Sequence, residues 1–126
     1  MKKNIFLLED DMNRVKFFKN RFENYNLVHA DNVELAKLLF INNSEYETIF
    51  LDHDLGGMTY VDSEDENTGF KFALFMKDIK KNFKYEKIVI HSMNPKGAYN
   101  IEKVFDGWDR IYSVPFSLLK ESLKVR

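Results

Sequence analysis

Carboxylate and imidazole side chains follow three apolar segments of the chain, each at the point where the segment ends. The apolar segments cover residues 4–8, 48–51 and 87–90, and the side chains that follow them are Glu9, Asp10 and Asp11, then Asp52, His53 and Asp54, then His91. Carboxylates crowded into a partly buried site repel one another unless a cation binds or some of them stay protonated. A bound metal ion is the simpler interpretation.

The candidate ligands restrict which metal could bind. We expect Glu9, Asp10, Asp52 and Asp54 to be the metal ligands. Mg²⁺ prefers carboxylate and water oxygens together with a substrate phosphate, whereas a contribution from imidazole favours Mn²⁺ or Zn²⁺. The chain has no cysteine, so thiolate metal sites, disulfides and cysteine nucleophiles are excluded. We therefore expect Mg²⁺ or Mn²⁺.

Several of these side chains also have a structural interpretation. Asp11 either caps a helix that starts after it or belongs to the site. Asp54 either belongs to the site, points into solvent, or caps a turn at residues 56–57. His53 and His91, taken singly, are more often structural than catalytic, although carboxylates beside them would raise the pKa of each imidazole and favour proton donation.

The segments that position these residues alternate between strand and helix patterns. Short apolar runs predict strands at residues 4–8, 27–30, 48–51, 87–90 and 110–114. Apolar residues at helical spacing lie between them, and a last short helix is expected at 117–125. This alternation predicts an α/β fold with a five-stranded parallel sheet and helices on both faces. Ligands bind such sheets beyond the carboxyl ends of the strands, which would bring the acids and histidines to one edge.

Two helix starts and one long loop are also predicted. Asp31 followed by Glu34 has the spacing of a capping box, and Asn94 followed by Pro95 offers a cap with proline in the first turn. Residues 56–68 form the longest irregular segment, which is acidic and polar. A loop of this length in a small domain is usually functional or mobile.

Length and charge exclude some classes of protein. The chain of 126 residues is expected to form a single domain, residues 1–126. Its formal net charge of -1 gives no general attraction to DNA. The first apolar run is too short for a signal peptide or a membrane span, so we expect a cytoplasmic protein that does not bind membranes.

The sequence resembles the receiver domain of two-component response regulators over essentially its whole length. The matching segments are FLLEDD, TIFLD, IVIHS and IYSVPFS. In that family an acidic pair follows the first strand, a phosphoaccepting Asp ends the third and a Ser or Thr ends the fourth; here these are Glu9 and Asp10, Asp52, and Ser92. The resemblance implies a flavodoxin-like strand order of 2-1-3-4-5 and a cis peptide bond before Pro115.

One position departs from the receiver pattern. Receivers carry a lysine immediately before that proline, where its ammonium group pairs with the phosphoryl group, and this chain has Val114. Losing that cation puts a conventional phosphorelay in doubt, because the cation couples phosphorylation to the conformational switch.

A resemblance to one group of atypical receivers accounts better for the valine at position 114. LDHDLGG at 51–57, TG at 68–69 and HSMNPKG at 91–97 look like the atypical receivers called cyclic-phosphate processing receiver domains. The resemblance implies metal-dependent hydrolysis of a cyclic phosphate on an RNA end or a nucleotide, with Asp52, His53, His91 and Ser92 as catalytic residues. Ser92 and Asn94 would hydrogen-bond phosphate oxygens, and both could also be explained as helix caps.

Two other functions stay open. One is a signalling receiver, phosphorylated on Asp52 or acting without phosphorylation, that regulates a protein partner. The other is a module that binds a phosphorylated ligand without turning it over. Val114 counts against ordinary signalling, and His53 and His91 count against a passive binder. The expected partner is therefore a phosphorylated small molecule or an RNA end.

Overall fold

Five parallel strands form one sheet in the computed structural model, which describes residues 2–124. The strand order is β2-β1-β3-β4-β5, so the predicted fold class and strand order are confirmed. The strands are β1 (Asn4–Leu8), β2 (Asn26–Ala30), β3 (Glu45–Leu51), β4 (Lys84–Ile90) and β5 (Ile111–Ser113). The helices are α1 (Met12–Arg21), α2 (Val33–Phe40), α3 (Gly69–Asp78), α4 (Pro95–Val104) and α5 (Phe116–Lys124), with a short 3-10 helix at Lys80–Asn82.

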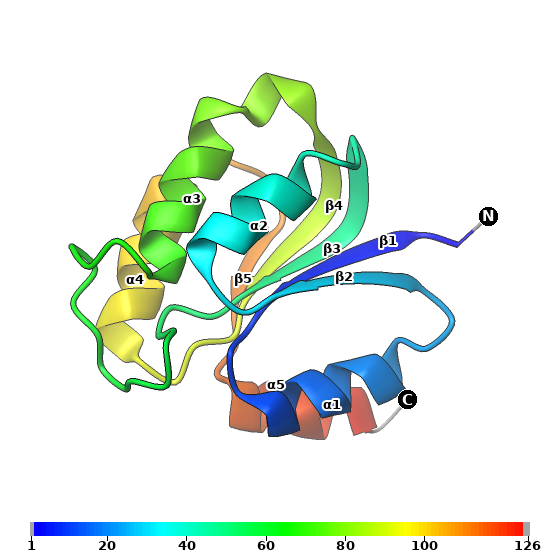
Figure 1. Cartoon of the computed structure of the whole chain (residues 1–126), viewed down its shortest axis with the longest axis horizontal. Coiled ribbons are helices and arrows are strands. Elements are labelled where there is room, and N and C mark those ends of the chain that lie inside the picture. Colours follow the sequence, from blue (N-terminus) through cyan, green and yellow to red (C-terminus); the bar gives the residue numbers. More distant parts are fainter. Residues whose placement is uncertain (1, 125–126) are drawn as a thin grey trace.

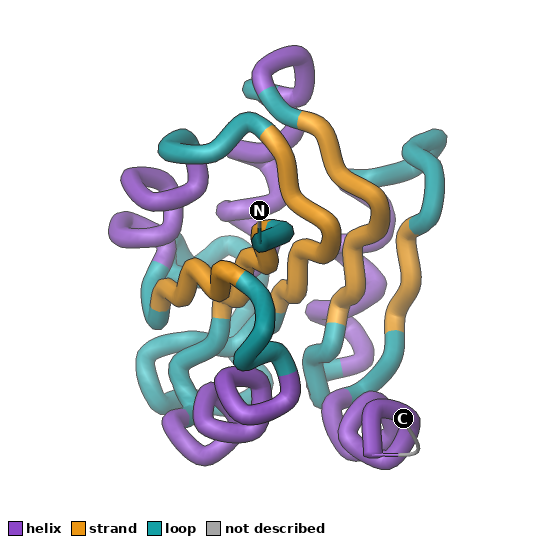
Figure 2. The backbone as a smooth tube through the Cα atoms, turned by 90° about the vertical axis from the view of Figure 1, so that its right-hand side faces the viewer, coloured by secondary structure: helices purple, strands orange, loops and turns teal. Residues whose placement is uncertain are grey.

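Helices cover both faces of the sheet. Figure 1 shows α2, α3 and α4 on one side, and α1 and α5 together on the other; these two lie below the strands in Figure 2. Alternate residues of β1 point into different cores: Phe6 and Leu8 pack with α2, α3 and α4, whereas Ile5 and Leu7 pack with α1 and α5. Burial on both faces explains why the central strands are continuous apolar runs.

Four of the five strands differ in extent from those predicted, and β2 begins one residue earlier, at Asn26. β3 begins at Glu45 and β4 at Lys84, each three residues before the apolar run. Backbone pairing of Glu45 with Lys84 extends both strands through polar residues, which an apolar pattern does not detect. β5 is shorter than predicted because Arg110 has a φ of 55°, outside the extended region. The described part of α5 ends at Lys124, and Val125 of the predicted helix lies outside the described residues.

Of the two predicted helix N-caps, one is wrong and one is confirmed. The capping box at Asp31 is wrong: Asn32 caps α2, and its side chain accepts a hydrogen bond from the Leu35 N–H. Both residues are good caps, and the chain turns into the helix one residue later than predicted. Asn94 caps α4 as predicted, accepting from the Gly97 N–H at 3.0 Å.

The predicted cis bond before Pro115 is also wrong, because the described residues contain no cis peptide bond. The trans form is the intrinsically preferred one for most residues before proline. The Pro115 carbonyl accepts hydrogen bonds from the Leu118 and Leu119 N–H groups in the first turn of α5. Among residues 2–124, no helix is both long and apolar enough to cross a membrane.

Candidate metal and phosphate site

Glu9, Asp52 and His91 are neighbours because three adjacent strands end in register. Leu8 of β1 pairs with Leu51 of β3, and Leu51 pairs with the last residue of β4. The ladder continues one residue further: the Asp52 N–H donates to the Leu8 carbonyl at 3.1 Å, and the His91 N–H donates to the Leu51 carbonyl at 2.9 Å. The sheet therefore fixes the backbone beneath all three side chains.

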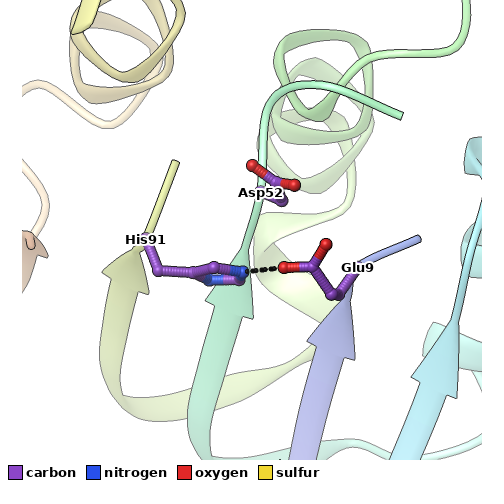
Figure 3. Close-up of side chains that lie close together, drawn as sticks. All are labelled: Glu9, Asp52 and His91. Carbon is purple, nitrogen blue, oxygen red and sulfur yellow. Dashed lines mark hydrogen bonds and ion pairs between the residues drawn. The ribbon is translucent and has the colours of Figure 1, made fainter. Parts of the chain in front are cut away.

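The three side chains form a buried cluster. One ligand atom of each lies within 4.8 Å of the others, and His91 Nε2 is 2.9 Å from Glu9 Oε1. In Figure 3, Glu9 and His91 point toward each other, and Asp52 lies beside the pair at the end of the strand between them. Glu9 and His91 are fully buried, and Asp52 is 4% exposed. The second Glu9 oxygen, Oε2, accepts from the Asp10 and Asp11 N–H groups.

Burial disfavours every charge in this cluster. It raises the pKa of Asp52 to about 7; the neighbouring Glu9 carboxylate adds to this shift and His91 opposes it. Burial also raises the pKa of Glu9, with partial opposition from the backbone N–H of Asp11 and the charge of Arg14. For His91, burial lowers the pKa to about 4, so the imidazole is neutral at neutral pH. Two carboxylates that are costly to ionise together are suited to a cation.

The cluster fits a divalent metal ion by its donor chemistry. Glu9 and Asp52 offer carboxylate oxygens, and a neutral imidazole can also ligate. Nδ1 of His91 is the one buried side-chain nitrogen or oxygen atom among the described residues that has no hydrogen-bond partner. The structure therefore provides a buried set of carboxylate and imidazole donors of the kind that can hold a divalent ion.

A pocket of about 240 Å³ opens beside the cluster. All four predicted metal ligands line it, whereas His53, His91, Ser92 and Asn94 do not. The ends of β1 and β3, the start of α1, the loop after β3 and the residue Met93 form its walls. The lining residues are Glu9, Asp10, Asp11, Arg14, Asp52, Asp54, Gly57, Met58, Thr59, Tyr60 and Met93.

The outer acids of the pocket are held by backbone N–H groups. Asp11 caps α1, accepting from Asn13 and Arg14, which is one of its two predicted roles. Asp10 Oδ2 accepts from the Gly57 N–H, so it ties β1 to the loop after β3. These two acids line the pocket while their side chains also fix the chain around it.

Asp54 is partly buried at the pocket wall, and its hydrogen bonds go to residues 60 and 61 rather than to the turn at residues 56–57. Its carboxylate accepts from the backbone N–H groups of Tyr60 and Val61 and lies 2.8 Å from His53 Nδ1. These hydrogen bonds lower the pKa of Asp54 despite partial burial. Asp54 therefore remains ionised at neutral pH and organises the loop that forms one wall of the pocket.

His53 lies behind the loop, away from the Glu9, Asp52 and His91 cluster. Its ring is fully buried, with Nδ1 beside Asp54 and Nε2 2.8 Å from Ser63 Oγ. Gly97 of α4 lets the ring approach: a Cβ there would lie 2.4 Å from His53 Cγ. Gly69 likewise lets the start of α3 approach the backbone of Asp52, because a Cβ at Gly69 would lie 1.9 Å from the Asp52 carbonyl oxygen. These contacts account for the glycines of the TG and HSMNPKG segments.

Ser92 and Asn94 are buried in the turn before α4. Ser92 Oγ accepts from the Asn94 N–H at 3.0 Å, which leaves the hydroxyl hydrogen free to donate. Asn94 uses both ends of its amide: Oδ1 caps α4, and Nδ2 donates to Asp54 Oδ1 at 3.1 Å. Asn94 thus links α4 to the loop after β3.

Arg14 is the residue of the pocket that the sequence analysis missed. Its Nη1 lies 3.8 Å from Glu9 Oε1 and 4.0 Å from Asp52 Oδ2. Arg14 lies in the first turn of α1, and no local pattern in the sequence marked it, because Glu9 and Asp52 come from β-strand ends outside that helix. Sequence reasoning looked for a cation at Val114, which instead packs against the apolar core on the α1 and α5 side.

Comparison with protein-family models identifies one family. The model described as cyclic-phosphate processing receiver domain matches residues 5–107, which include every residue of the buried cluster and the pocket. A search of curated proteins found no match.

Solved structures of response regulators have the same fold. The phosphorylated cyanobacterial phytochrome response regulator RcpA is 16% identical, with a TM-score of 0.67 over 99% of this chain and 91% of that one. TrrA from Thermotoga maritima, in complex with Mg²⁺ and BeF, is 24% identical, with a TM-score of 0.64 over 98% and 97%. The Mn²⁺-bound response regulator Rcp1 is 17% identical, with a TM-score of 0.63 over 98% and 88%. At these identities the likeness shows the fold.

Proposed function

The chain belongs to the family of cyclic-phosphate processing receiver domains, and we propose that its single domain, residues 1–126, hydrolyses a cyclic phosphate ester with the help of a divalent metal ion. The observation that carries this proposal is the buried cluster of Glu9, Asp52 and His91 beside an open acidic pocket. The proposed substrate is the cyclic phosphate of an RNA end or of a nucleotide.

Glu9 and Asp52 are the proposed inner ligands of Mg²⁺ or Mn²⁺, with Asp10 and Asp54 at the rim of the same pocket. A divalent ion would supply neutralisation of phosphate charge and a lower pKa for an attacking water. Two solved response regulators with this fold contain Mg²⁺ or Mn²⁺, which supports the choice of ion.

The buried polar residues are proposed to act in two ways. Ser92 has a free hydroxyl hydrogen that could be donated to a phosphate oxygen. His91 orients Glu9 through its 2.9 Å contact, and its lowered pKa favours a neutral imidazole in that role over a charged proton donor. His53 and Asn94 are proposed to act indirectly, by holding Asp54 and the loop that closes one side of the pocket.

The test is ring opening by the purified chain. With Mg²⁺ or Mn²⁺, the chain should convert a 2′,3′-cyclic nucleotide to a phosphomonoester. Phosphorus NMR would measure this conversion. Glu9→Gln and Asp52→Asn should each lower kcat/KM by at least about 100-fold, because each removes a charged metal ligand. Glu23→Gln, which removes an exposed acid after α1, should leave turnover unchanged. If Glu9→Gln and Asp52→Asn each kept the wild-type kcat/KM, the proposal would be overturned.

A signalling receiver is the second candidate, favoured by the position of Asp52 directly after β3 on the wall of the pocket. In that case acetyl phosphate and Mg²⁺ should phosphorylate Asp52, which intact-mass spectrometry would detect, and the chain would regulate a protein partner. Phosphorylation of Asp52 without activity on any 2′,3′-cyclic or 3′,5′-cyclic nucleotide would favour signalling over hydrolysis.

A further inference from the structure

The pocket combines acidic metal ligands with one cation, Arg14, and the position of that cation suggests a function of its own. We propose that Arg14 is a phosphate-binding residue of this site, and that it holds the two non-bridging oxygens of a phosphodiester anion beside the metal. This inference rests on the proposed function in so far as the ligand is a phosphate ester.

The Arg14 guanidinium lies at the pocket, where the described residues give it two ion pairs but no hydrogen bond. It is the one Lys or Arg side chain among the described residues that line the pocket. Its nearest carboxylate oxygens, on Glu9 and Asp52, are 3.8 and 4.0 Å from Nη1, too far for hydrogen bonds. A planar fork of N–H donors that faces a pocket suits an anion with two oxygens in one plane.

The surrounding structure holds the Arg14 side chain in place. Its backbone N–H donates to the Asp11 cap at 3.2 Å, which fixes it in the first turn of α1. Its guanidinium carbon lies 5.0 Å from the centre of the Phe116 ring, which comes from the start of α5. The ring in turn packs against Phe17 and Phe18 of α1. An aromatic ring supports a guanidinium without using its N–H donors, which stay available for a ligand.

The balance of charge favours such a cation. Five acids line the pocket, Glu9, Asp10, Asp11, Asp52 and Asp54. A divalent ion would supply two positive charges, fewer than these acids carry when ionised. Arg14 brings a further positive charge next to Glu9 and Asp52, which lowers the repulsion that a phosphate anion would meet there.

Arg14 should therefore weaken metal binding and strengthen phosphate binding. Without an anion it competes with the metal for Glu9 and Asp52, since like charges repel. With the metal bound, it attracts phosphate. Removing the charge should tighten metal binding and weaken phosphate binding, and this pair of opposite effects distinguishes an anion-binding residue from one that merely stabilises the acidic cluster.

The experiment measures both affinities on the intact chain. Mg²⁺ would be titrated into wild type, Arg14→Gln and Arg14→Lys by calorimetry, and inorganic phosphate would then be titrated into each Mg²⁺-saturated protein by NMR. Arg14→Gln should weaken phosphate binding about 10-fold to 100-fold, the usual cost of a lost charged hydrogen bond. The same variant should bind Mg²⁺ at least about fivefold more tightly, because a like charge is removed.

The other variants complete the test. Arg14→Lys keeps the charge and loses the fork, so its phosphate affinity should lie between those of wild type and Arg14→Gln. Lys16→Gln removes an exposed charge from the same helix and should change neither affinity. A thermal melt of each variant confirms folding, and Arg14→Lys preserves the test if Arg14→Gln does not fold.

The outcomes separate this inference from the proposed function. Unchanged phosphate affinity in Arg14→Gln, weaker Mg²⁺ binding, or no phosphate binding by Mg²⁺-loaded wild type would overturn the role of Arg14. Phosphate binding that depends on Arg14, with no opening of any cyclic phosphate, would refute hydrolysis and leave the anion site standing.

Discussion

Asp52 has opposite effects on stability and on ligand binding. Its side chain is nearly buried beside Glu9, and burial raises its pKa to about 7 from the ordinary value of 3.8. Because the folded-state pKa is above the unfolded one, the folded state favours protonated Asp52. That stabilisation is complete below about pH 4 and is lost as the pH rises through 7. In the metal-free protein at pH 8, ionised Asp52 is therefore a cost to folding, as expected for a metal ligand.

We expect Asp52→Asn to stabilise the metal-free protein at alkaline pH. A shift of about three pKa units corresponds to at most about 4 kcal/mol, so the free energy of unfolding in EDTA at pH 8 should rise by a few kcal/mol. The gain should shrink as the pH falls from 7 toward 4, because wild-type Asp52 then becomes protonated. Urea unfolding at several pH values would measure it. A gain independent of pH, or a loss of stability at pH 8, would contradict the assigned cause.

At the scale of elements, the loop after β3 and helix α4 form one unit through His53. The ring contacts Ser63 and Asp54 of the loop on its two nitrogens and packs on Gly97 of α4. Asn100 of α4 also donates to Ser63 Oγ at 2.9 Å. A loop of this length would otherwise be costly to order. Its polar contacts position the segment that lines the pocket.

Gly97→Ala should break this arrangement. The added methyl would lie 2.4 Å from His53 Cγ, so the ring or the helix must move. We expect a loss of about 1–3 kcal/mol in unfolding free energy, as for other overpacked cores, although alanine is the better helix former. Chemical denaturation would measure it. The control is Lys96→Ala, an exposed neighbour on α4, which should change stability little; a similar loss in both variants would mean that the ring contact is not the cause.

At the scale of the whole molecule, the site joins strands that are far apart in sequence. Glu9 and His91 are separated by 82 positions and contact each other through their side chains. A metal ion bound between β1 and β3 would therefore stabilise the sheet as a whole, because the unfolded chain cannot assemble the same ligands.

Mg²⁺ or Mn²⁺ should raise the Tm of the purified chain, and EDTA should reverse the rise. At a free concentration of about 100 times Kd, the gain is about 2.7 kcal/mol, or about 10 °C for a domain of this size. The rise should be larger at pH 8 than at pH 6, because Asp52 with a pKa of about 7 must lose its proton to bind. Differential scanning calorimetry would follow it. An equal rise in Asp52→Asn would show that the ion binds elsewhere.

The sequence by itself determined the strand ends and therefore the edge at which the acids meet. Apolar runs buried on both faces define β1, β3 and β4, and the first polar residue after each run is Glu9, Asp52 or His91. Parallel strands joined by crossover helices expose these ends on one side of the sheet. The fold class followed from these local patterns, because spacing along one segment is enough to define a strand or a helix. The strand order and the family followed from the resemblance of the motifs to receiver domains.

Only the tertiary structure decided which of these side chains meet. The sequence treated His53 and His91 alike, yet His91 contacts Glu9 while His53 faces the loop and α4. It also gave no role to Arg14, whose position depends on how α1 packs against α5. Local patterns fix where an element starts and which face is apolar. They do not fix how neighbouring elements pack or which backbone N–H groups a carboxylate will meet, and those contacts distinguish a metal ligand from a loop anchor.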